Sequence, residues 1–376
     1  MSSIFPTYAR WDVTVQRAEG ATLIDTDGKE YLDFTSGIGV CNLGHNHPIV
    51  NKKIKEQLDQ VWHVSNLFHI PTQEQAATIL TENTCGDYVF FCNSGAEGNE
   101  AAIKLARKYT GKSKIISFKQ SFHGRTFGSM SATGQEKIHE GYGPLLEQFE
   151  YAVFNDINSV KSLVDNQVAA VMIEVIQGEG GVHPADPRFM EELQQLCIDN
   201  KILLIVDEVQ TGIGRTGKAF AYEHYDLSPD IIVSAKGLGN GFPIGAVIGK
   251  EKLKEAFGPG SHGSTYGGNP LATTAACAVM SQVFQPEFLK EVEVKGNYFM
   301  ELLNEKLTST FVNEIKGKGL MVGIECNGEV GSLLTEMREK GFLALSAGPN
   351  VIRLLPPLTV TKEQLKSAVS VLAEVL

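Results

Sequence analysis

One lysine stands apart from the other basic residues of the sequence. Lys236 is the only charged residue between positions 231 and 243, where it follows an apolar run and precedes a loop of glycines. Most lysines are solvated surface charges. At the end of a buried strand, however, desolvation would lower the pKa of Lys236 and leave the amine neutral. A neutral amine in a pocket is the nucleophile that Schiff-base chemistry needs.

An acidic residue is placed in a similar way. Asp207 closes the apolar run 202–206, upstream of Lys236. A lysine and a carboxylate at the ends of two strands are the pair used with pyridoxal phosphate: the lysine binds the cofactor aldehyde, and the acid pairs with the pyridinium nitrogen. The two residues therefore predict pyridoxal 5'-phosphate as the cofactor.

The totals set the class of protein. A chain of 376 residues exceeds the size of a single hydrophobic core, so we expect two domains. Hydrophobic residues make up 43% and charged residues 20%, as in globular proteins. The net charge of −11 argues against nucleic acid or an anionic membrane as a partner.

Cysteine usage and the N-terminus bear on localisation. The six cysteines form no CxxC pair and several lie in apolar surroundings, which indicates free thiols in a reducing compartment. The segment 1–6 lacks the basic and apolar regions of a signal peptide, and no apolar run is long enough to cross a bilayer. We expect a cytoplasmic protein.

The middle of the chain alternates helix and strand. The expected strands are continuous apolar runs, which indicates that both faces are buried in a mostly parallel sheet. The fold class is therefore α/β, with helices flanking the sheet. Strands are expected at 88–92, 114–118, 168–173, 202–206 and 231–234, and helices at 72–83, 98–110, 187–199, 269–284 and 287–309.

At both ends of the chain, the expected order of helices and strands differs from that of the middle. A hairpin is expected at 21–34, and Pro48 should begin a helix that ends near residue 60. Short strands and helices then follow at 315–325, 329–340, 342–345, 351–355 and 361–375. We predict an N-terminal segment (1–60) that contributes to a small domain, a large cofactor-binding domain (61–309), and a C-terminal small α+β domain (310–376).

A phosphate site is predicted where the strand 88–92 leads into the next helix. Ser94 and Glu97 have the spacing of a capping box, and Gly95 and Ala96 let the backbone approach a ligand. Free N–H groups and the helix dipole favour a phosphate there. An ordinary helix cap is the alternative interpretation.

Further candidates lie in loops that follow the strands. Phe122 could stack on a planar ring, and Arg125 could bind a carboxylate. Glu174 and Glu179 follow the strand 168–173, at the sheet edge where ligands bind in α/β folds. Arg353 stands inside an apolar strand and needs a partner, either a carboxylate ligand or Glu179. Core packing and solvated surface charge are the alternatives.

Two motifs point elsewhere, and we do not adopt them. The segment 212–217 reads as GxGxxG and nearly as a P-loop, but Ala219 replaces the hydroxyl residue that would hold magnesium. His45 and His47 have a possible metal-ligand spacing without further ligands, so we interpret them as turn residues and expect no metal. A nucleotide-binding protein stays as an alternative class.

Taken together, the motifs resemble those of the class III (omega-amino acid) aminotransferases, which have pyridoxal phosphate fold type I. The resemblance covers nearly the whole chain, in the right order. It rests on SGAE at 94–97, FHGRT at 122–126, QGEGG at 177–181, DEVQTGIGRTG at 207–217, SAKGLGNGFP at 234–243 and STYGGNP at 264–270. Gly98 stands where many relatives have alanine, a harmless change at a helix start.

This resemblance implies how the cofactor is held. Lys236 would bind the aldehyde and shuttle protons, and Asp207 would keep the ring nitrogen protonated. The motif that begins at Asp207 would line the cofactor, and one phosphate contact would come from the neighbouring subunit of a homodimer. The implied cofactor-binding residues are Gly95, Ala96, Phe122, Asp207, Glu208, Val209, Gln210, Lys236 and Thr265.

The resemblance also implies substrate residues. Arg125 and Ser264 would bind the carboxylate end of the donor. Arg353 would pair with Glu179 while a long donor is bound, then turn to the α-carboxylate of glutamate. Ile38 stands where ornithine aminotransferases have a tyrosine for the free α-amine, and an apolar residue suits an acylated amine better.

The expected reaction transfers the δ-amino group of N2-acetyl-L-ornithine to 2-oxoglutarate. The products are N-acetylglutamate 5-semialdehyde and L-glutamate, a step of arginine biosynthesis, and the branch of the family that the chain resembles is the bacterial one acting on acetylornithine. Ornithine, succinylornithine, succinyldiaminopimelate and 4-aminobutyrate remain alternative donors. An aminomutase or a decarboxylase on the same fold is a further alternative.

Overall fold

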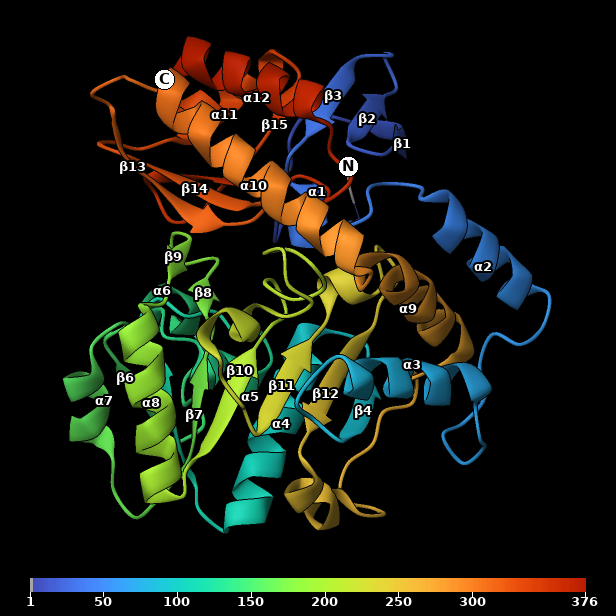
Figure 1. Ribbon diagram of the computed structural model, residues 1–376, viewed down its shortest axis with the longest axis vertical. Coiled ribbons are helices and arrows are strands. Elements are labelled where there is room, and N and C mark those ends of the chain that lie inside the picture. The colour runs from blue at the N-terminus through green and yellow to red at the C-terminus, as the bar shows by residue number, and fades with distance from the viewer. Residues whose placement is uncertain (1–2) are drawn as a thin grey trace.

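The computed structural model describes residues 3–376, and its larger part is built around one sheet (Figure 1). Met1 and Ser2, which belong to the segment interpreted above as lacking a signal peptide, lie outside the described residues. The strand order is β4-β12-β11-β10-β7-β5-β6. These strands are β4 (Tyr88–Cys92), β5 (Lys114–Phe118), β6 (Phe149–Ala152), β7 (Val168–Ile173), β10 (Leu203–Asp207), β11 (Ile231–Ser234) and β12 (Gly245–Gly249).

The sheet is mostly parallel, which confirms the expected fold class. β11, β10, β7, β5 and β6 pair in parallel, whereas β12 is antiparallel to both of its neighbours. All residues of β7, β10 and β11 are buried, because helices cover both faces of the sheet, so continuous apolar runs form these strands. β6 and β12 were not expected from the sequence.

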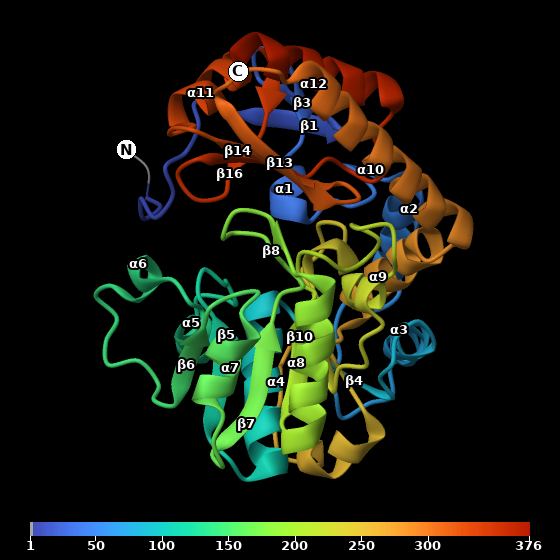
Figure 2. The ribbon, with the colours of Figure 1, turned by 60° about the vertical axis from the view of Figure 1, so that its left-hand side comes forward.

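Helices cover this sheet, and small side chains let one of them pack closely. Helix α4 contacts β7, β10, β11 and β12, and its Ala101, Ala102 and Ala106 have no exposed surface. Figure 2 shows the helices around the strands. The helices of this part are α3 (Pro71–Glu82), α4 (Gly95–Thr110), α5 (Phe127–Ala132), α6 (Glu136–His139), α7 (Ile157–Leu163), α8 (Pro187–Asn200) and α9 (Pro270–Val283).

The long helix α10 (Pro286–Lys306) leads from the large sheet to a second group of elements, at the top of Figures 1 and 2. Its sheet has the antiparallel order β13-β14-β17-β16. The members are β13 (Val312–Lys318), β14 (Met321–Cys326), β16 (Leu345–Ser346) and β17 (Val351–Leu354), with helices α11 (Gly331–Glu339) and α12 (Lys362–Val375) beside them.

The single strand expected at 315–325 is wrong. The chain reverses there and forms the hairpin of β13 and β14. Gly317 and Gly319 make the reversal possible because both have positive φ angles, +133° and +58°. The hydrophobic pattern alone predicted one strand, because apolar residues stand on both sides of these two glycines.

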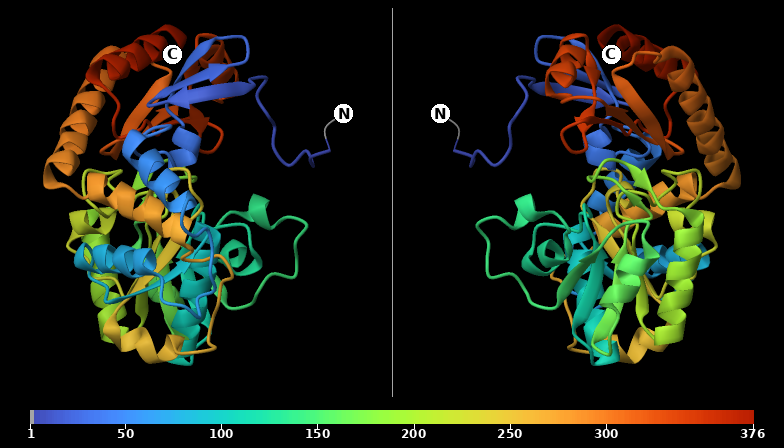
Figure 3. Two further views of the ribbon diagram at one scale, coloured as in Figure 1. Left: turned by 90° about the vertical axis from the view of Figure 1, so that its right-hand side faces the viewer. Right: turned by 90° about the vertical axis from the view of Figure 1, so that its left-hand side faces the viewer.

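The N-terminal strands lie beside C-terminal elements (Figure 3). The strands β1 (Val15–Glu19), β2 (Thr22–Asp25) and β3 (Glu30–Asp33) form a sheet with β15 (Phe342–Leu343), which pairs with β3 in parallel. The expected hairpin is therefore confirmed as β2 and β3. The pairing with β15 supports our proposal that the segment 1–60 contributes to the small domain.

The segment after β3 carries the two histidines considered above. The turn-like helix α1 (Ser36–Gly39) and the helix α2 (Pro48–Leu58) flank them, and Pro48 begins α2 as expected. His45 Nε2 lies 2.8 Å from Asp33 Oδ2, and this contact raises the pKa of His45 to about 10. Within residues 3–376, no cluster of three or more His, Cys, Asp or Glu residues is placed to hold a metal ion.

The helices and the cysteines bear on the membrane and redox expectations. None of the helices in residues 3–376 combines the length and the apolar character needed to cross a membrane. All six cysteines are free.

Candidate active site

Asp207 and Lys236 meet at one edge of the large sheet. Asp207 is the last residue of β10, and Lys236 follows two residues after the end of the neighbouring parallel strand β11. Parallel strands bring their carboxyl ends to the same edge, where ligands bind in open α/β sheets. Lys236 has a φ angle of +44°, which is rare for a residue with a side chain and marks a constrained functional position.

A cavity of about 450 Å³ opens at this edge. Lys236 and Asp207 both line it, together with the first turn of α4 and the loops after β5 and β7. The structure thus brings together most of the residues expected in the site. Of those residues, the cavity is lined by Gly95, Ala96, Phe122, Arg125, Glu179, Asp207, Val209, Gln210 and Lys236.

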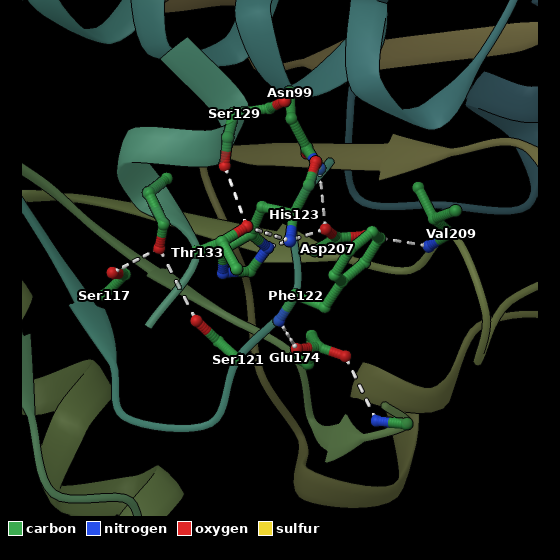
Figure 4. Close-up of polar contacts among 12 residues, drawn as sticks. Asn99, Ser117, Ser121, Phe122, His123, Ser129, Thr133, Glu174, Asp207 and Val209 are labelled. Carbon is green, nitrogen blue, oxygen red and sulfur yellow. Dashed lines mark hydrogen bonds and ion pairs between the residues drawn. The ribbon is translucent and has the colours of Figure 1, made fainter. Parts of the chain in front are cut away.

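Three neighbours hold the Asp207 carboxylate (Figure 4). Asn99 Nδ2 donates to Oδ2 at 2.8 Å, and His123 Nδ1 lies 2.8 Å from the same oxygen. The backbone N–H of Val209 donates to Oδ1 at 3.0 Å. Asn99 and His123 also line the cavity, although the sequence reasoning did not select them. His123 lies within the FHGRT motif and Asn99 lies two residues after the SGAE motif, but the sequence does not show that both contact Asp207.

The Lys236 amine is suited to act as a nucleophile. Burial lowers the pKa of Lys236, and the nearby Arg353 guanidinium adds to the decrease, while the Glu179 and Asp207 carboxylates oppose it. A lower pKa increases the share of the neutral amine, which is the reactive form.

The first turn of α4 provides an anion site. Ser94 is the N-cap and accepts a hydrogen bond from the N–H of Glu97 at 3.2 Å, which leaves the N–H groups of Gly95 and Ala96 at the cavity. A Cβ atom at Gly95 would lie 2.8 Å from the methyl carbons of Val209, so only glycine fits. Backbone donors and the helix dipole at such a terminus favour a phosphate group.

Glu179 and Arg353 form a bidentate ion pair beside Lys236. Arg353 Nη1 and Nη2 donate to Glu179 Oε1 and Oε2 at 2.6 and 3.1 Å, and Nη1 also donates to Gln210 Oε1 at 3.2 Å. Burial alone would raise the pKa of Glu179, but the charge of Arg353 outweighs it and holds this pKa below its ordinary value. The arginine side chain is 2% exposed, so the pair neutralises a buried charge.

Arg125 lies at the open side of the cavity. Its guanidinium carbon is 5.7 Å from the centre of the Phe122 ring, and the residue is exposed. Gly124 makes this turn with a φ angle of +138°, and a Cβ atom there would lie 2.4 Å from Ser129 Oγ. The turn thus presents an exposed cation that can bind a carboxylate entering the site.

The side chains of two residues expected in the site, Glu208 and Ile38, do not line the cavity. The Glu208 carboxylate does not line the cavity; it accepts hydrogen bonds from the N–H of Tyr222 and the hydroxyl of Thr211 in the core. The side chain of Glu208 therefore packs in the core, and the cofactor contact expected for this residue stays a prediction. Ile38 is 45% exposed and does not line the cavity either, whereas its neighbour Val40 does.

Ser264 and Thr265 lie near the site without lining it. Ser264 Oγ accepts a hydrogen bond of 3.2 Å from Asn93, a residue that does line the cavity. Thr265 is exposed on the surface of the chain. The cofactor contact expected for Thr265 stays a prediction.

The glycine loop 212–217 has a structural task. Arg215 is fully buried, and its guanidinium donates to the Asn42 side chain and to the backbone carbonyls of Leu320 and Pro356. The loop leads into a short 3-10 helix only at Ala221 and so lacks the helix start of a P-loop. It joins the large sheet to the C-terminal elements and does not bind a nucleotide by that motif.

The residues at this edge fit pyridoxal phosphate. An amine of lowered pKa, a buried carboxylate held by three neighbours, and a glycine-shaped helix N-terminus all meet one cavity. These groups match the aldehyde, the ring nitrogen and the phosphate of that cofactor. The fold and the site define a pyridoxal-phosphate-dependent aminotransferase.

The comparison with known families agrees with this class. The family model described as "Aminotransferase class-III" matches residues 6–376. The chain belongs to the class-III aminotransferase family.

Several relatives are similar over their full length. The acetylornithine aminotransferase of Bacillus subtilis (strain 168) is 58% identical, with 100% of this chain and 98% of that protein covered. The acetylornithine aminotransferase of Halalkalibacterium halodurans is 60% identical, with the same coverage.

Solved structures share the fold. The N-acetylornithine aminotransferase from Stenotrophomonas maltophilia K279a has a TM-score of 0.85 and 35% identity, covering 98% of this chain and 96% of that one. The ornithine aminotransferase from Toxoplasma gondii ME49 has a TM-score of 0.95 and 31% identity, covering 99% and 92%.

Proposed function

We propose that this chain transfers the δ-amino group of N2-acetyl-L-ornithine to 2-oxoglutarate, forming N-acetylglutamate 5-semialdehyde and L-glutamate. Identities of 58% and 60% to acetylornithine aminotransferases, over the full length, support this donor. The geometric observation that carries the proposal is the Glu179–Arg353 pair beside Lys236, because a two-substrate transaminase must bind donors with and without a carboxylate near the reacting amine.

In this proposal each residue has a defined task. Pyridoxal phosphate, when bound, supplies the aldehyde that receives the amino group and a ring that withdraws electrons. Lys236 Nζ would hold the aldehyde in the resting enzyme and, once the substrate amine has replaced it, would take the proton from the substrate carbon that carries that amine. Asp207 keeps the ring nitrogen protonated, and Asn99 and His123 hold its carboxylate in place.

The remaining residues bind and orient. Gly95 and Ala96 would hold the phosphate, and Phe122, Val209 and Gln210 would line the ring. All five residues line the cavity. Arg125 and Ser264 bind the carboxylate end of acetylornithine.

The Glu179–Arg353 pair selects between substrates. With acetylornithine bound, the reacting end of the donor carries no carboxylate, and the Glu179–Arg353 pair stays closed. With glutamate bound, Arg353 leaves Glu179 and binds the α-carboxylate. One cavity thus accepts a terminal amine in one half-reaction and an α-amine in the other.

Arg353→Ala is expected to affect the two half-reactions unequally. Loss of a buried charge partner costs about 2–5 kcal/mol, so kcat/KM for the glutamate half-reaction should fall by about 30-fold or more, with a smaller decrease for acetylornithine. The measurement is the loss of the visible absorbance of the bound cofactor after mixing with each amino donor. Arg188→Ala, on the exposed surface of α8, is the matched control. Equal losses for both donors would contradict the selective role.

Other reactions on this frame are separated by product analysis. The purified protein is incubated with acetylornithine, with and without 2-oxoglutarate, and glutamate is quantified. The proposal expects glutamate in amounts equal to the semialdehyde, and only when the acceptor is present. Consumption of many equivalents of donor per enzyme without an acceptor would instead indicate an aminomutase or a decarboxylase.

Ornithine is the second candidate donor. The TM-score of 0.95 to an ornithine aminotransferase is higher than that to the acetylornithine aminotransferase cited above. At 31% identity, however, this likeness describes the backbone more than the substrate. The full-length identities of 58% and 60% to acetylornithine aminotransferases are higher, and they favour the acylated donor.

A homodimer with a shared active site is part of this proposal. Exposed apolar side chains gather near Thr265, where Asn66 Nδ2 donates to the carbonyls of Ser264 and Gly267 and His63 lies against Tyr266. A patch of this kind is typical of a protein interface. It consists of Trp62, Leu67, Phe68 and Tyr266, which are between 61% and 91% exposed.

The six free cysteines are typical of a cytoplasmic protein.

A further inference from the structure

Glu174 is a buried carboxyl group that the roles above do not use. It follows the last residue of β7, is 7% exposed and lines the same cavity as Lys236. Among the described residues, it forms no ion pair with a lysine or arginine, unlike Glu179. A buried carboxyl of this kind costs free energy, which suggests that its position serves a purpose.

Its two oxygens join two loops (Figure 4). Oε1 accepts a hydrogen bond of 2.8 Å from the N–H of Phe122, in the loop after β5. Oε2 accepts one of 3.1 Å from the N–H of Gly178, in the loop that leads to Glu179. The side chain thus ties the residue that lines the cofactor ring to the segment that carries the partner of Arg353.

We propose that Glu174 is a positioning residue for the amino transfer, a bridge that fixes the Phe122 loop and the Glu179 loop relative to each other. This inference rests on the proposed function, since it concerns the same cavity. An ionised carboxylate accepts from both N–H groups at full strength, whereas protonation turns one oxygen into an O–H group, which is a weaker acceptor. The bridge is therefore complete when Glu174 is deprotonated and half open when it is protonated.

The surroundings of Glu174 bring this change near neutral pH. Burial raises the pKa of Glu174 to about 7, and Asp207 adds to the increase, while His123 and the two N–H donors oppose it. Lys236 is the other charged group that interacts with Glu174 from a packed element. As the pH falls through about 7, the bridge opens, so kcat/KM should fall for both half-reactions.

The test compares the holoenzyme of the wild type with Glu174→Gln, which has nearly the same shape but a single acceptor oxygen. Amide hydrogen exchange resolved to single residues reports the two hydrogen bonds directly. We expect the Phe122 or Gly178 amide to exchange about ten-fold faster in E174Q, the factor for loss of one hydrogen bond. The decrease of kcat/KM below about pH 7 should become smaller in E174Q, which has no group to protonate at that position.

Glu223→Gln is the matched control. Glu223 is half-buried, lies outside the cavity and accepts a hydrogen bond of 2.7 Å from the N–H of Phe220. Its replacement should leave the exchange of both amides and the pH profile unchanged.

Unchanged amide exchange in E174Q, or a full acidic decrease of kcat/KM in that variant, would overturn the bridge. Failure of the wild type to react with acetylornithine would overturn the proposed donor instead. The amide exchange does not depend on the donor, so the two failures are distinguishable.

Discussion

Lys236→Ala is expected to abolish transamination. Removal of a catalytic nucleophile typically lowers kcat by about 10⁴-fold or more, and no other amine is present among the residues that line the cavity. Alanine keeps the Cβ atom, so the backbone strain at φ +44° is unchanged. Steady-state glutamate formation measures the effect, and Lys254→Ala, on a partly exposed lysine near Tyr88, is the control.

The same variant should keep its fold and its cofactor site. Burial disfavours the charged amine of Lys236, so its removal relieves a desolvation cost, and we expect an unfolding temperature no lower than that of the wild type. Cofactor should still bind through the helix N-terminus and Asp207, although without a covalent link. Retained multiple turnover in Lys236→Ala would contradict the Schiff-base role.

Asp207→Asn is expected to have the next largest effect. Loss of one charge that is fixed in the site costs about 10²- to 10³-fold in kcat. The amide cannot reproduce the contacts either, because its NH2 group would face a donor, whether Asn99 or the N–H of Val209. The ring nitrogen would then lose the partner that keeps it protonated.

Turnover and cofactor affinity should be measured together for this variant. Asp207→Glu, which keeps the charge on a longer side chain, should lose less activity than Asp207→Asn and serves as the comparison. Equal activity of Asp207→Asn and the wild type would show that the charge at this position does not support the reaction.

The position of the site was predictable from the sequence for a physical reason. Buried parallel strands are continuous apolar runs, so the ends of β10 and β11 could be located, and with them Asp207 and Lys236. The start of α4 was predictable because a capping serine and small residues have a local signature.

Other features depend on contacts between distant segments. The antiparallel strand β12 is short and begins and ends with glycine, so no local pattern marks its direction. The contacts of Asn99 and His123 with Asp207 join three segments, and local spacing does not show them.

Glu208 could have been placed correctly. Successive side chains of a strand point to opposite faces, so the residue after Asp207 should face away from the cavity, as it does. The direction of the Ile38 side chain could not be predicted, because it depends on the left-handed backbone at Ser36 and Ile38. The role predicted for the exposed Thr265 involves a second subunit, so contacts within one chain do not test it.

The most direct test of the account is the single-turnover rate of the holoenzyme with separate amino donors. N2-acetyl-L-ornithine, ornithine, 4-aminobutyrate and succinyldiaminopimelate are each mixed with it, and the loss of the visible absorbance of the bound cofactor is followed. We expect the highest kcat/KM for acetylornithine and a slow response to free ornithine. A faster reaction with ornithine or 4-aminobutyrate would contradict the proposed substrate.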